Sequence, residues 1–274
     1  MPSVRTGDGV EIHYRVDDFR DPWIEGPGET IVMSHGFARS MVWWTQWVPA
    51  LARKYKVLRY DIRGCGGSSV PPEDVPWSAD RIAADVVDVI DDLGIDGVHW
   101  VGFESGGLWG IVYAVNHPDR IKSLTLCNTP AGIGTGHFAA AGIRACDEIR
   151  RVGFPQWLID TRATRMDLAL ADPRLDEWHV QEHAKTPTEV AASLMDVLEV
   201  LDVSQMHSRI KVPALVMYSD RAKSCPPEEQ ARVWHAIPDS RLVTFPDMAA
   251  GIQLLIPDRC TAEVLRFLDK VTTG

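Results

Sequence analysis

The chain has 274 residues and a formal net charge of −10 at pH 7, because 38 acidic side chains outnumber 28 basic ones. This charge argues against nucleic acids and anionic membranes as partners, and the length suffices for one α/β domain with an insertion. No apolar run reaches the roughly 18–20 residues that span a membrane. Five cysteines without a C-x-x-C pair, and a start without an apolar signal core, favour a cytoplasmic protein without a metal site.

The first hundred residues predict strands that alternate with helices. Residues 4–6 and 11–16 flank an Asp-Gly turn, which indicates a hairpin. After a loop, the sequence predicts short apolar strands and helices in turn, at 31–34, 43–54, 56–60 and 78–93. Ser78 is the expected N-cap of the last of these helices. The alternation favours βαβ units and a mostly parallel sheet.

The glycine-rich run at 101–107 has the pattern of a nucleophile elbow, a strand that turns sharply into a helix. In the G-x-S-x-G pattern the nucleophile follows the first glycine by two residues. Counting from Gly102 places Glu104 at that position, and Gly106 closes the pattern. The small residues that let strand and helix approach closely are therefore present, but a carboxylate replaces the reactive hydroxyl.

Three further motifs surround this elbow. A His-Gly turn follows the strand at 31–34, an Asp-Ile-Arg-Gly run follows the strand at 56–60, and Asn-His-Pro-Asp-Arg precedes a strand at 123–127. In this order and spacing they resemble the α/β-hydrolase superfamily. Val-Leu-Arg-Tyr-Asp at 57–61, Leu-Cys-Asn-Thr at 126–129 and Ile-Gly-Thr at 133–135 are most similar to the 3-oxoadipate enol-lactonase group. The resemblance implies an α/β-hydrolase fold with a mostly parallel central sheet.

The strand pattern stops at about residue 132 and returns at 214–218. The segment between them is helical and is broken by three prolines. The resemblance implies a helical lid inserted after the sixth strand. We therefore expect an α/β-hydrolase core at 1–131, a lid at 132–203 and the second part of the core at 204–274.

The two partners of a catalytic triad are missing from their expected positions. A hydrolase that resembles this chain carries an acid after the seventh strand and a histidine after the eighth. Here those positions hold Ala222 and Ala250, and no histidine follows His235, which we expect on the surface. Asp220 could replace the acid only in a reshaped loop, and otherwise it caps a turn. Ordinary serine-type ester hydrolysis then lacks the general base that activates the hydroxyl or water.

The resemblance nevertheless implies a retained oxyanion hole, built from the backbone N–H groups of Phe37 and Ser105. Converging donors of this kind stabilise an enolate or oxyanion whatever the nucleophile is. The remaining candidates for the site are His35 in the oxyanion turn, Trp43 and Trp44 after it, and His137 at the start of the lid. Of the two tryptophans we expect at least one to line the pocket and the other to pack in the core. The other histidines at 179, 183 and 207 are expected on the surface or in packing, and Arg63 is expected to hold the loop of Asp61.

These features favour an enzyme in which Glu104 acts as a general acid or base on a small carbonyl, lactone or enol substrate. Elimination, decarboxylation, isomerisation and atypical hydrolysis all fit this chemistry. The sequence shows no metal, flavin or nucleotide motif, so we expect no cofactor, and it leaves open whether the chain is a monomer or a homo-oligomer.

Three alternatives remain. Haloalkane dehalogenases and epoxide hydrolases of the same superfamily use a carboxylate nucleophile at the elbow, although theirs is Asp and depends on the histidine that is missing here. A register shifted by one residue would make Ser105 the nucleophile. The chain could also be a catalytically inert protein that binds a ligand in the retained pocket.

Overall fold

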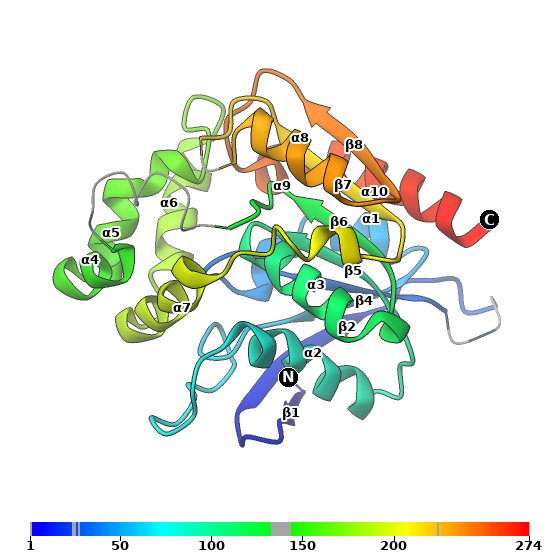
Figure 1. Cartoon of the computed structure of the whole chain (residues 1–274), viewed down its shortest axis with the longest axis horizontal. Helices are drawn as coiled ribbons and strands as arrows, with labels where there is room; N and C mark the ends of the chain where they lie inside the picture. The colour runs from blue at the N-terminus through cyan, green and yellow to red at the C-terminus, as the bar shows by residue number, and fades with distance from the viewer. Residues whose placement is uncertain (1, 24–25, 27, 133–143, 224, 274) are drawn as a thin grey trace.

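A computed structural model describes residues 2–23, 26, 28–132, 144–223 and 225–273 (Figure 1). Its centre is an eight-stranded sheet in the order β1-β2-β4-β3-β5-β6-β7-β8. The two strands of the N-terminal hairpin are antiparallel, and every pairing from β4 to β8 is parallel. The mostly parallel sheet expected from the sequence is therefore confirmed.

The strands of the sheet have the following bounds: β1 Ser3–Arg5, β2 Glu11–Asp17, β3 Thr30–Ser34, β4 Lys56–Tyr60, β5 Val98–Phe103, β6 Ile121–Cys127, β7 Ala214–Ser219 and β8 Ser240–Phe245. The α-helices in the described residues are α1 Val48–Leu51, α2 Ala79–Asp92, α3 Ser105–Asn116, α4 Ala145–Val152, α5 Phe154–Thr161, α6 Pro173–His183, α7 Thr188–Val200, α8 Pro227–Ala236, α9 Ile252–Leu255 and α10 Pro257–Thr273. Short 3₁₀ helices are η1 Met41–Trp44, η2 Pro118–Arg120, η4 Arg162–Thr164 and η5 His207–Arg209. None of these helices is long and apolar enough to cross a membrane.

Helices cover both faces of the sheet, α2, α3 and α8 on one face and α1 and α10 on the other (Figure 1). Every residue of β3 and β5 is buried, as expected for parallel strands that lie between two layers of helices. The carboxyl ends of these central strands lie at one edge of the sheet, where ligands bind in open α/β folds.

Two local expectations have different outcomes. The helix expected at 78–93 is present as α2, and the Ser78 hydroxyl accepts a hydrogen bond of 3.2 Å from the Arg81 N–H, as an N-cap does. The single helix expected at 43–54 is wrong. The chain instead forms η1 and then the short helix α1, which begins with Pro49 in its first turn. Because proline has no N–H to bond to the preceding turn, it starts a helix here and does not continue one.

In the described part of the chain, the α-helices between β6 and β7 are α4 to α7, and together they stand beyond one end of the sheet (left in Figure 1). We call them the inserted helices. The two ends of the insertion meet in an antiparallel bridge between Gly132 and Asp202, and the Val203 N–H donates to the Ala131 carbonyl at 2.9 Å. A segment closed at its base in this way can be added to a core without disturbing the order of the strands.

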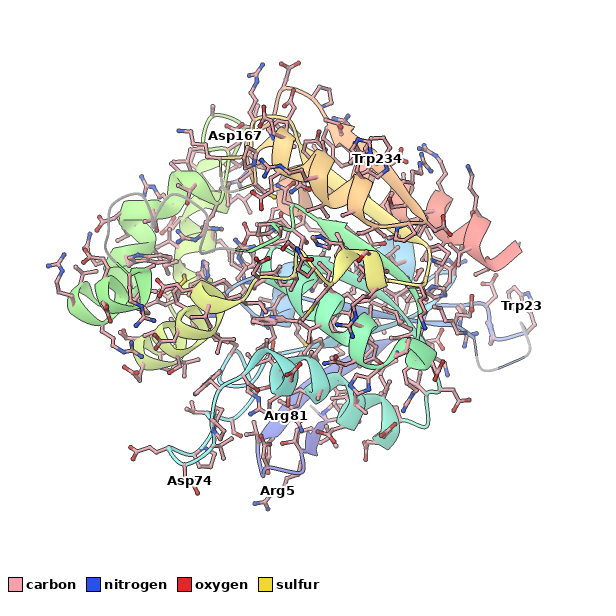
Figure 2. All side chains as sticks on the ribbon, in the orientation of Figure 1. Arg5, Trp23, Asp74, Arg81, Asp167 and Trp234 are labelled. Carbon is pink, nitrogen blue, oxygen red and sulfur yellow. The ribbon has the colours of Figure 1, made fainter. Side chains whose placement is uncertain are left out.

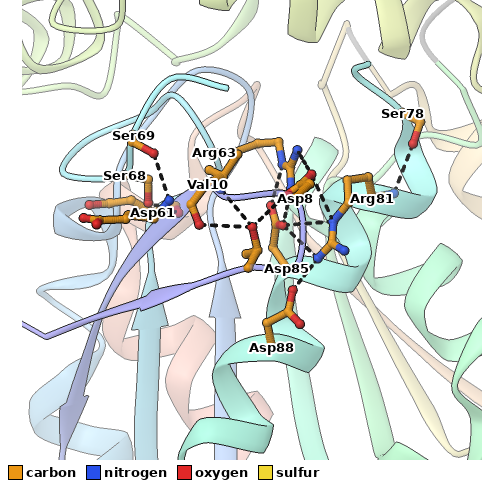
Figure 3. Close-up of polar contacts among 12 residues, drawn as sticks. Asp8, Val10, Asp61, Arg63, Ser68, Ser69, Ser78, Arg81, Asp85 and Asp88 are labelled. Atoms are coloured by element: carbon orange, nitrogen blue, oxygen red, sulfur yellow. Dashed lines mark hydrogen bonds and ion pairs between the residues drawn. The ribbon is translucent and has the colours of Figure 1, made fainter. Parts of the chain in front are cut away.

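Arg63 holds the loop that begins at Asp61 through charge-assisted bonds, as expected, but its partners lie outside that loop. The guanidinium of Arg63 bonds to the buried Asp85 on α2 at 2.6 and 2.8 Å and to Asp8 in the hairpin turn at 2.9 Å (Figure 3). Asp61 is held instead by His13 Nδ1 at 2.9 Å and by the Met41 N–H at 2.6 Å. A carboxylate as buried as Asp85 requires a charged partner, and Arg63 supplies it.

Candidate active site

The elbow joins β5 to α3 in a strained backbone. Glu104 has φ 48° and ψ −115°, and the N–H of Glu104 donates to the Cys127 carbonyl at 2.9 Å. A Cβ added at Gly106 would lie 2.1 Å from the Ser34 carbonyl oxygen, and one at Gly102 would lie 2.4 Å from the Gly106 oxygen. Only glycine fits these two positions. Strain of this kind is typical of functional sites, where the surrounding structure holds one side chain in a fixed direction.

The Glu104 carboxylate has a charged partner that the sequence argument did not identify. Its Oε2 lies 3.2 Å from Nη2 of Arg39, and the side chains of the pair are 16% and 1% exposed, respectively. A Cβ added at Gly36 would meet Arg39 Nη1 at 3.0 Å and Glu104 Oε2 at 3.1 Å. The carboxylate therefore lies against the His-Gly turn. The available signal was a single arginine in the otherwise apolar run that follows this turn.

Arg39 itself lies between two aromatic rings. Its Cζ is 4.6 Å from the centroid of Trp43 and 4.8 Å from that of Phe103. Burial lowers the pKa of Arg39 below its ordinary value, and the nearby Glu104 carboxylate partly opposes this shift. None of its three guanidinium nitrogens makes a hydrogen bond with another described residue. Most of the hydrogen bonds that this guanidinium could donate are therefore not made within the described residues.

A second buried arginine comes from the inserted segment. Arg165 follows η4, and its Cζ is 4.2 Å from the ring centroid of Trp157 on α5. Its Nη1 donates to the Thr161 hydroxyl at 2.6 Å. Burial lowers the pKa of Arg165 to about 9, an effect that Glu104 opposes and Arg39 reinforces. The guanidinium is still charged at neutral pH. No sequence pattern singled out Arg165, because η4 lies far from the elbow along the chain.

The histidine of the oxyanion turn supports the backbone of that turn. His35 Nδ1 donates to the Gly36 carbonyl at 2.9 Å, and its Nε2 accepts from the Ile62 N–H at 3.0 Å. Burial lowers the pKa of His35 to about 4, so the ring is neutral and both nitrogens are used. His35 therefore has no free ring nitrogen for a direct role in the chemistry.

The two residues expected to supply oxyanion donors come from the end of this turn and from the start of α3. Ser105 is the first residue of α3, so its N–H is among those that a helix start leaves without an intrahelical partner. The carbonyl of Phe37 accepts from Nε2 of His183 at 2.7 Å, which links the turn to α6. The ring of Phe37 packs edge-on against Trp157 at 5.9 Å. Both residues are buried beside the elbow, where the retained turn places them.

The two tryptophans after the turn face different environments. Trp44 packs against Trp47 with ring centroids 5.0 Å apart, in the core next to α10. Trp43 contacts the inserted helices, with centroids 5.0 Å from His179 and 5.6 Å from His183. These histidines are buried rather than on the surface, and burial with the nearby arginine charges lowers the pKa of each below its ordinary value. His137, the remaining sequence candidate, lies outside the described residues.

The positions expected for the acid and the histidine of a triad are buried and apolar, since Ala222 and Ala250 are each 2% exposed. Asp220 accepts a hydrogen bond of 3.2 Å from the Met248 N–H, and backbone hydrogen bonds lower its pKa. It therefore caps the loop after β8. Asp167 ties this loop to the inserted segment, because it accepts from the Ala249 N–H and its own N–H donates to the Ala250 carbonyl, both at 2.9 Å. Figure 2 shows Asp167 at this meeting point (top of the view).

Comparison with known proteins agrees with this architecture. The family model of the alpha/beta hydrolase fold matches residues 29–255. The chain belongs to the alpha/beta hydrolase fold family.

Individual relatives within this family include hydrolases. The 3-oxoadipate enol-lactonase 2 of Acinetobacter baylyi is 30% identical over 190 residues, which is 68% of this chain and 69% of that protein. RutD of Caulobacter segnis is 38% identical over 108 residues, so that match spans only 39% of this chain and 40% of RutD. The crystal structure of the enol-lactonase from Burkholderia xenovorans LB400 superposes with a TM-score of 0.86 at 28% identity, covering 98% of this chain and all of that one. The likeness to enol-lactonases expected from the sequence is confirmed.

Proposed function

We propose that the protein is a cofactor-free enzyme in which Glu104 transfers a proton to or from a small carbonyl, lactone or enol substrate. The observation that carries this proposal is the position of the carboxylate. Glu104 stands where the elbow directs its side chain, at the start of α3 and against the His-Gly turn. It is 16% exposed, so a small molecule can reach it.

The surrounding groups suit the formation of an enolate. The backbone N–H groups of Phe37 and Ser105 would donate to the substrate's carbonyl oxygen as negative charge develops on it. Glu104 would take the proton from the neighbouring carbon, and it would return a proton to a different atom of the enolate. Arg39 would balance the carboxylate's charge while the substrate is in place. Isomerisation and elimination share this first step, whereas the conversion of an enol to its ketone would use Glu104 to deliver a proton to the carbon. The relatives that are enol-lactonases favour an enol or lactone substrate.

A serine mechanism finds no general base in the described part of the site. Ala222 and Ala250 cannot accept a proton. The two nearby imidazoles, His179 and His183, have lowered pKa values, and Nε2 of His183 is already bonded to Phe37. Among the described residues, Ser105 Oγ has no hydrogen-bond partner that would remove its proton.

Two other functions make different predictions. If Glu104 were a nucleophile, it would form an ester with the substrate, and without a histidine to activate water that ester would persist and add its mass to the protein. If the protein only binds its ligand, the ion pair between Arg39 and Glu104 would be a structural part of the binding pocket. That pair is the specific observation in favour of a binding protein, because it gives the carboxylate a role without chemistry.

The test of proton transfer is the exchange of substrate hydrogens with solvent deuterium. A panel of small lactones, enols and β-keto acids is incubated in D₂O with the wild type and with Glu104→Gln, and α-hydrogen loss is followed by proton NMR. We expect the wild type to accelerate exchange in at least one compound and Glu104→Gln to leave it at the uncatalysed rate. Equal exchange by the two proteins would contradict the proposal, and a persistent mass increase would favour the nucleophilic alternative.

A further inference from the structure

We propose that Arg39 and Arg165 together bind a carboxylate group of the ligand, next to Glu104. We call this pair, with the surrounding side chains of Trp43, His179 and His183, the anion site. The inference rests on the proposed function only in placing the ligand beside Glu104. Binding of an anion is measured independently of any turnover.

The first observation is a concentration of buried donors that lack an acceptor. Within the described residues, no hydrogen-bond partner is found for Arg39 Nε, Nη1 and Nη2, for Trp43 Nε1 or for the ring nitrogens of His179, one of which donates in the neutral ring. Arginine and tryptophan can only donate. A buried polar group left unsatisfied costs about 1–3 kcal/mol. Such a group of donors fits an acceptor that comes from outside the chain.

The second observation is the balance of charge. Arg39 and Arg165 are 2% and 8% exposed, and Glu104 is the acidic group whose charge acts on both of them. The neighbouring histidines are neutral, because burial and the two guanidinium charges lower their pKa values. Two cations and one anion leave one positive charge. A single carboxylate neutralises it, whereas a phosphate monoester at neutral pH carries more charge than the site can balance.

Other buried arginines in the protein show what a satisfied guanidinium looks like here. Arg63 bonds to Asp85 and Asp8, and Arg59 bonds to Asp17 at 2.6 and 2.9 Å. Each therefore has a carboxylate in hydrogen-bonding geometry. Arg39 has only the ion pair with Glu104, and Arg165 bonds to the hydroxyl of Thr161. Unlike Arg59 and Arg63, neither Arg39 nor Arg165 has a carboxylate of the protein in hydrogen-bonding geometry among the described residues. This difference is expected if the two arginines bind a ligand.

The third observation concerns the direction from which an anion can reach the two guanidinium groups. The ring of Trp43 lies over Arg39, and the ring of Trp157 lies over Arg165. Phe37, whose ring is 5.9 Å from that of Trp157, continues this aromatic wall. An anion therefore approaches each guanidinium from a side that the ring does not occupy. Arginine can donate two parallel hydrogen bonds to a carboxylate in that position.

The test compares propanoate with propanamide, which has a similar shape and no charge. Dissociation constants are measured by ligand-observed NMR titration on the full chain, for the wild type, Arg165→Met and the control Arg162→Met. Arg162 lies in the same segment, its side chain is 42% exposed, and the ion-pair partner found for it among the described residues is the distant Asp176, at 3.9 Å. We expect propanoate to bind the wild type more tightly than propanamide, and Arg165→Met to weaken propanoate binding about 10- to 100-fold, as the loss of charged hydrogen bonds does. Arg162→Met should leave it unchanged. Equal binding of the two probes, or an equal loss in both variants, would overturn the proposal.

Inorganic phosphate and Glu104→Gln complete the design. Phosphate should bind more weakly than propanoate, and tighter phosphate binding would contradict the assignment of a carboxylate. Removing the negative charge of Glu104 should tighten propanoate binding, so an unchanged or weaker affinity in Glu104→Gln would contradict a position beside that carboxylate. Because Arg39→Met leaves Glu104 without its partner and could prevent folding, Arg39 is tested as Arg39→Met/Glu104→Gln, which should bind propanoate more weakly than Glu104→Gln. If these results hold while Glu104→Gln keeps full solvent exchange, the anion site stands and the proton-transfer role fails.

Discussion

Glu104 is held in a backbone conformation that non-glycine residues seldom adopt, with φ 48°. The strain is sustained by the close contact of α3 with the end of β3, where Gly106 touches backbone oxygen atoms. This contact aims the carboxylate at Arg39 and at the His-Gly turn. At the scale of single residues, the site therefore depends as much on glycines without side chains as on the charged groups.

The first prediction concerns Gly106. In Gly106→Ala the new methyl group would lie 2.1 Å from the Ser34 carbonyl oxygen and 2.6 Å from that of His35, so the backbone must move. We expect the free energy of unfolding to fall by about 3 kcal/mol or more, as in severe overpacking. Urea denaturation measures this. The matched control is Gly7→Ala, where an added Cβ meets nothing within 4 Å, and a similar loss in both variants would show that the elbow contact is not the cause.

The charged residues of the site could be predicted from the sequence only in part. Glu104 was found because the glycine spacing of an elbow is a local pattern. Arg39 and Arg165 were not, because their significance lies in their shared surroundings, which only the folded chain brings together. The sequence does not show which arginine has partners in the folded chain, where Arg63 has two carboxylate partners and Arg39 has unused donors.

At the scale of elements, α6 provides two buried histidines to the site. His179 is 1% exposed and His183 is fully buried, and both contact the ring of Trp43. The sequence suggested surface or packing roles, because a histidine in a helix without a strong apolar stripe gives no sign of burial. Their burial follows from docking of the inserted helices onto η1, an arrangement that helical periodicity does not encode.

The second prediction is a pH dependence of stability. Burial lowers the pKa of His179 from 6.5 in the unfolded chain to about 2. A depressed pKa means that the unfolded chain binds the proton and the folded chain does not, so the stabilisation is complete above pH 6.5 and is lost as the pH falls. His179→Phe keeps an aromatic ring against Trp43 and removes this titration.

Chemical denaturation at pH 7 and pH 5 measures the difference. The wild type should lose about 2 kcal/mol more than His179→Phe between these values, since each pKa unit corresponds to about 1.4 kcal/mol. This window lies above the range in which most carboxylates titrate. Parallel losses in the two proteins would show that the folded protein accepts a proton at His179.

For the molecule as a whole, the order of strands and helices follows from the sequence because burial of parallel strands and helical periodicity are both visible there. The mostly parallel sheet and α2 were predicted on that basis. The helix at 43–54 was not correct, since the apolar residues of that stretch serve two different cores, one around Trp44 and one around Trp43. The fold alone does not determine the reaction, because proteins with the same fold catalyse many different reactions.

The third prediction follows from the proposal that the site lacks a catalytic triad. The protein should hydrolyse activated aryl esters no faster than background, and fluorophosphonate probes should not label Ser105. Glu104→Ser should be equally inactive, because Ala250 still provides no base. Labelling is read by mass spectrometry, and stoichiometric modification of Ser105 in the wild type would establish a serine nucleophile in a shifted register.

The most direct test of the central claim is the single-turnover rate of Glu104→Gln on a substrate found in the deuterium-exchange panel, measured beside its binding isotherm. Glutamine keeps the size of the side chain and removes the transferable proton. The proposed role predicts that turnover falls roughly 10²–10⁴-fold, the usual contribution of a general acid or base, while the substrate still binds. Undiminished turnover in Glu104→Gln would contradict the claim that Glu104 transfers the proton.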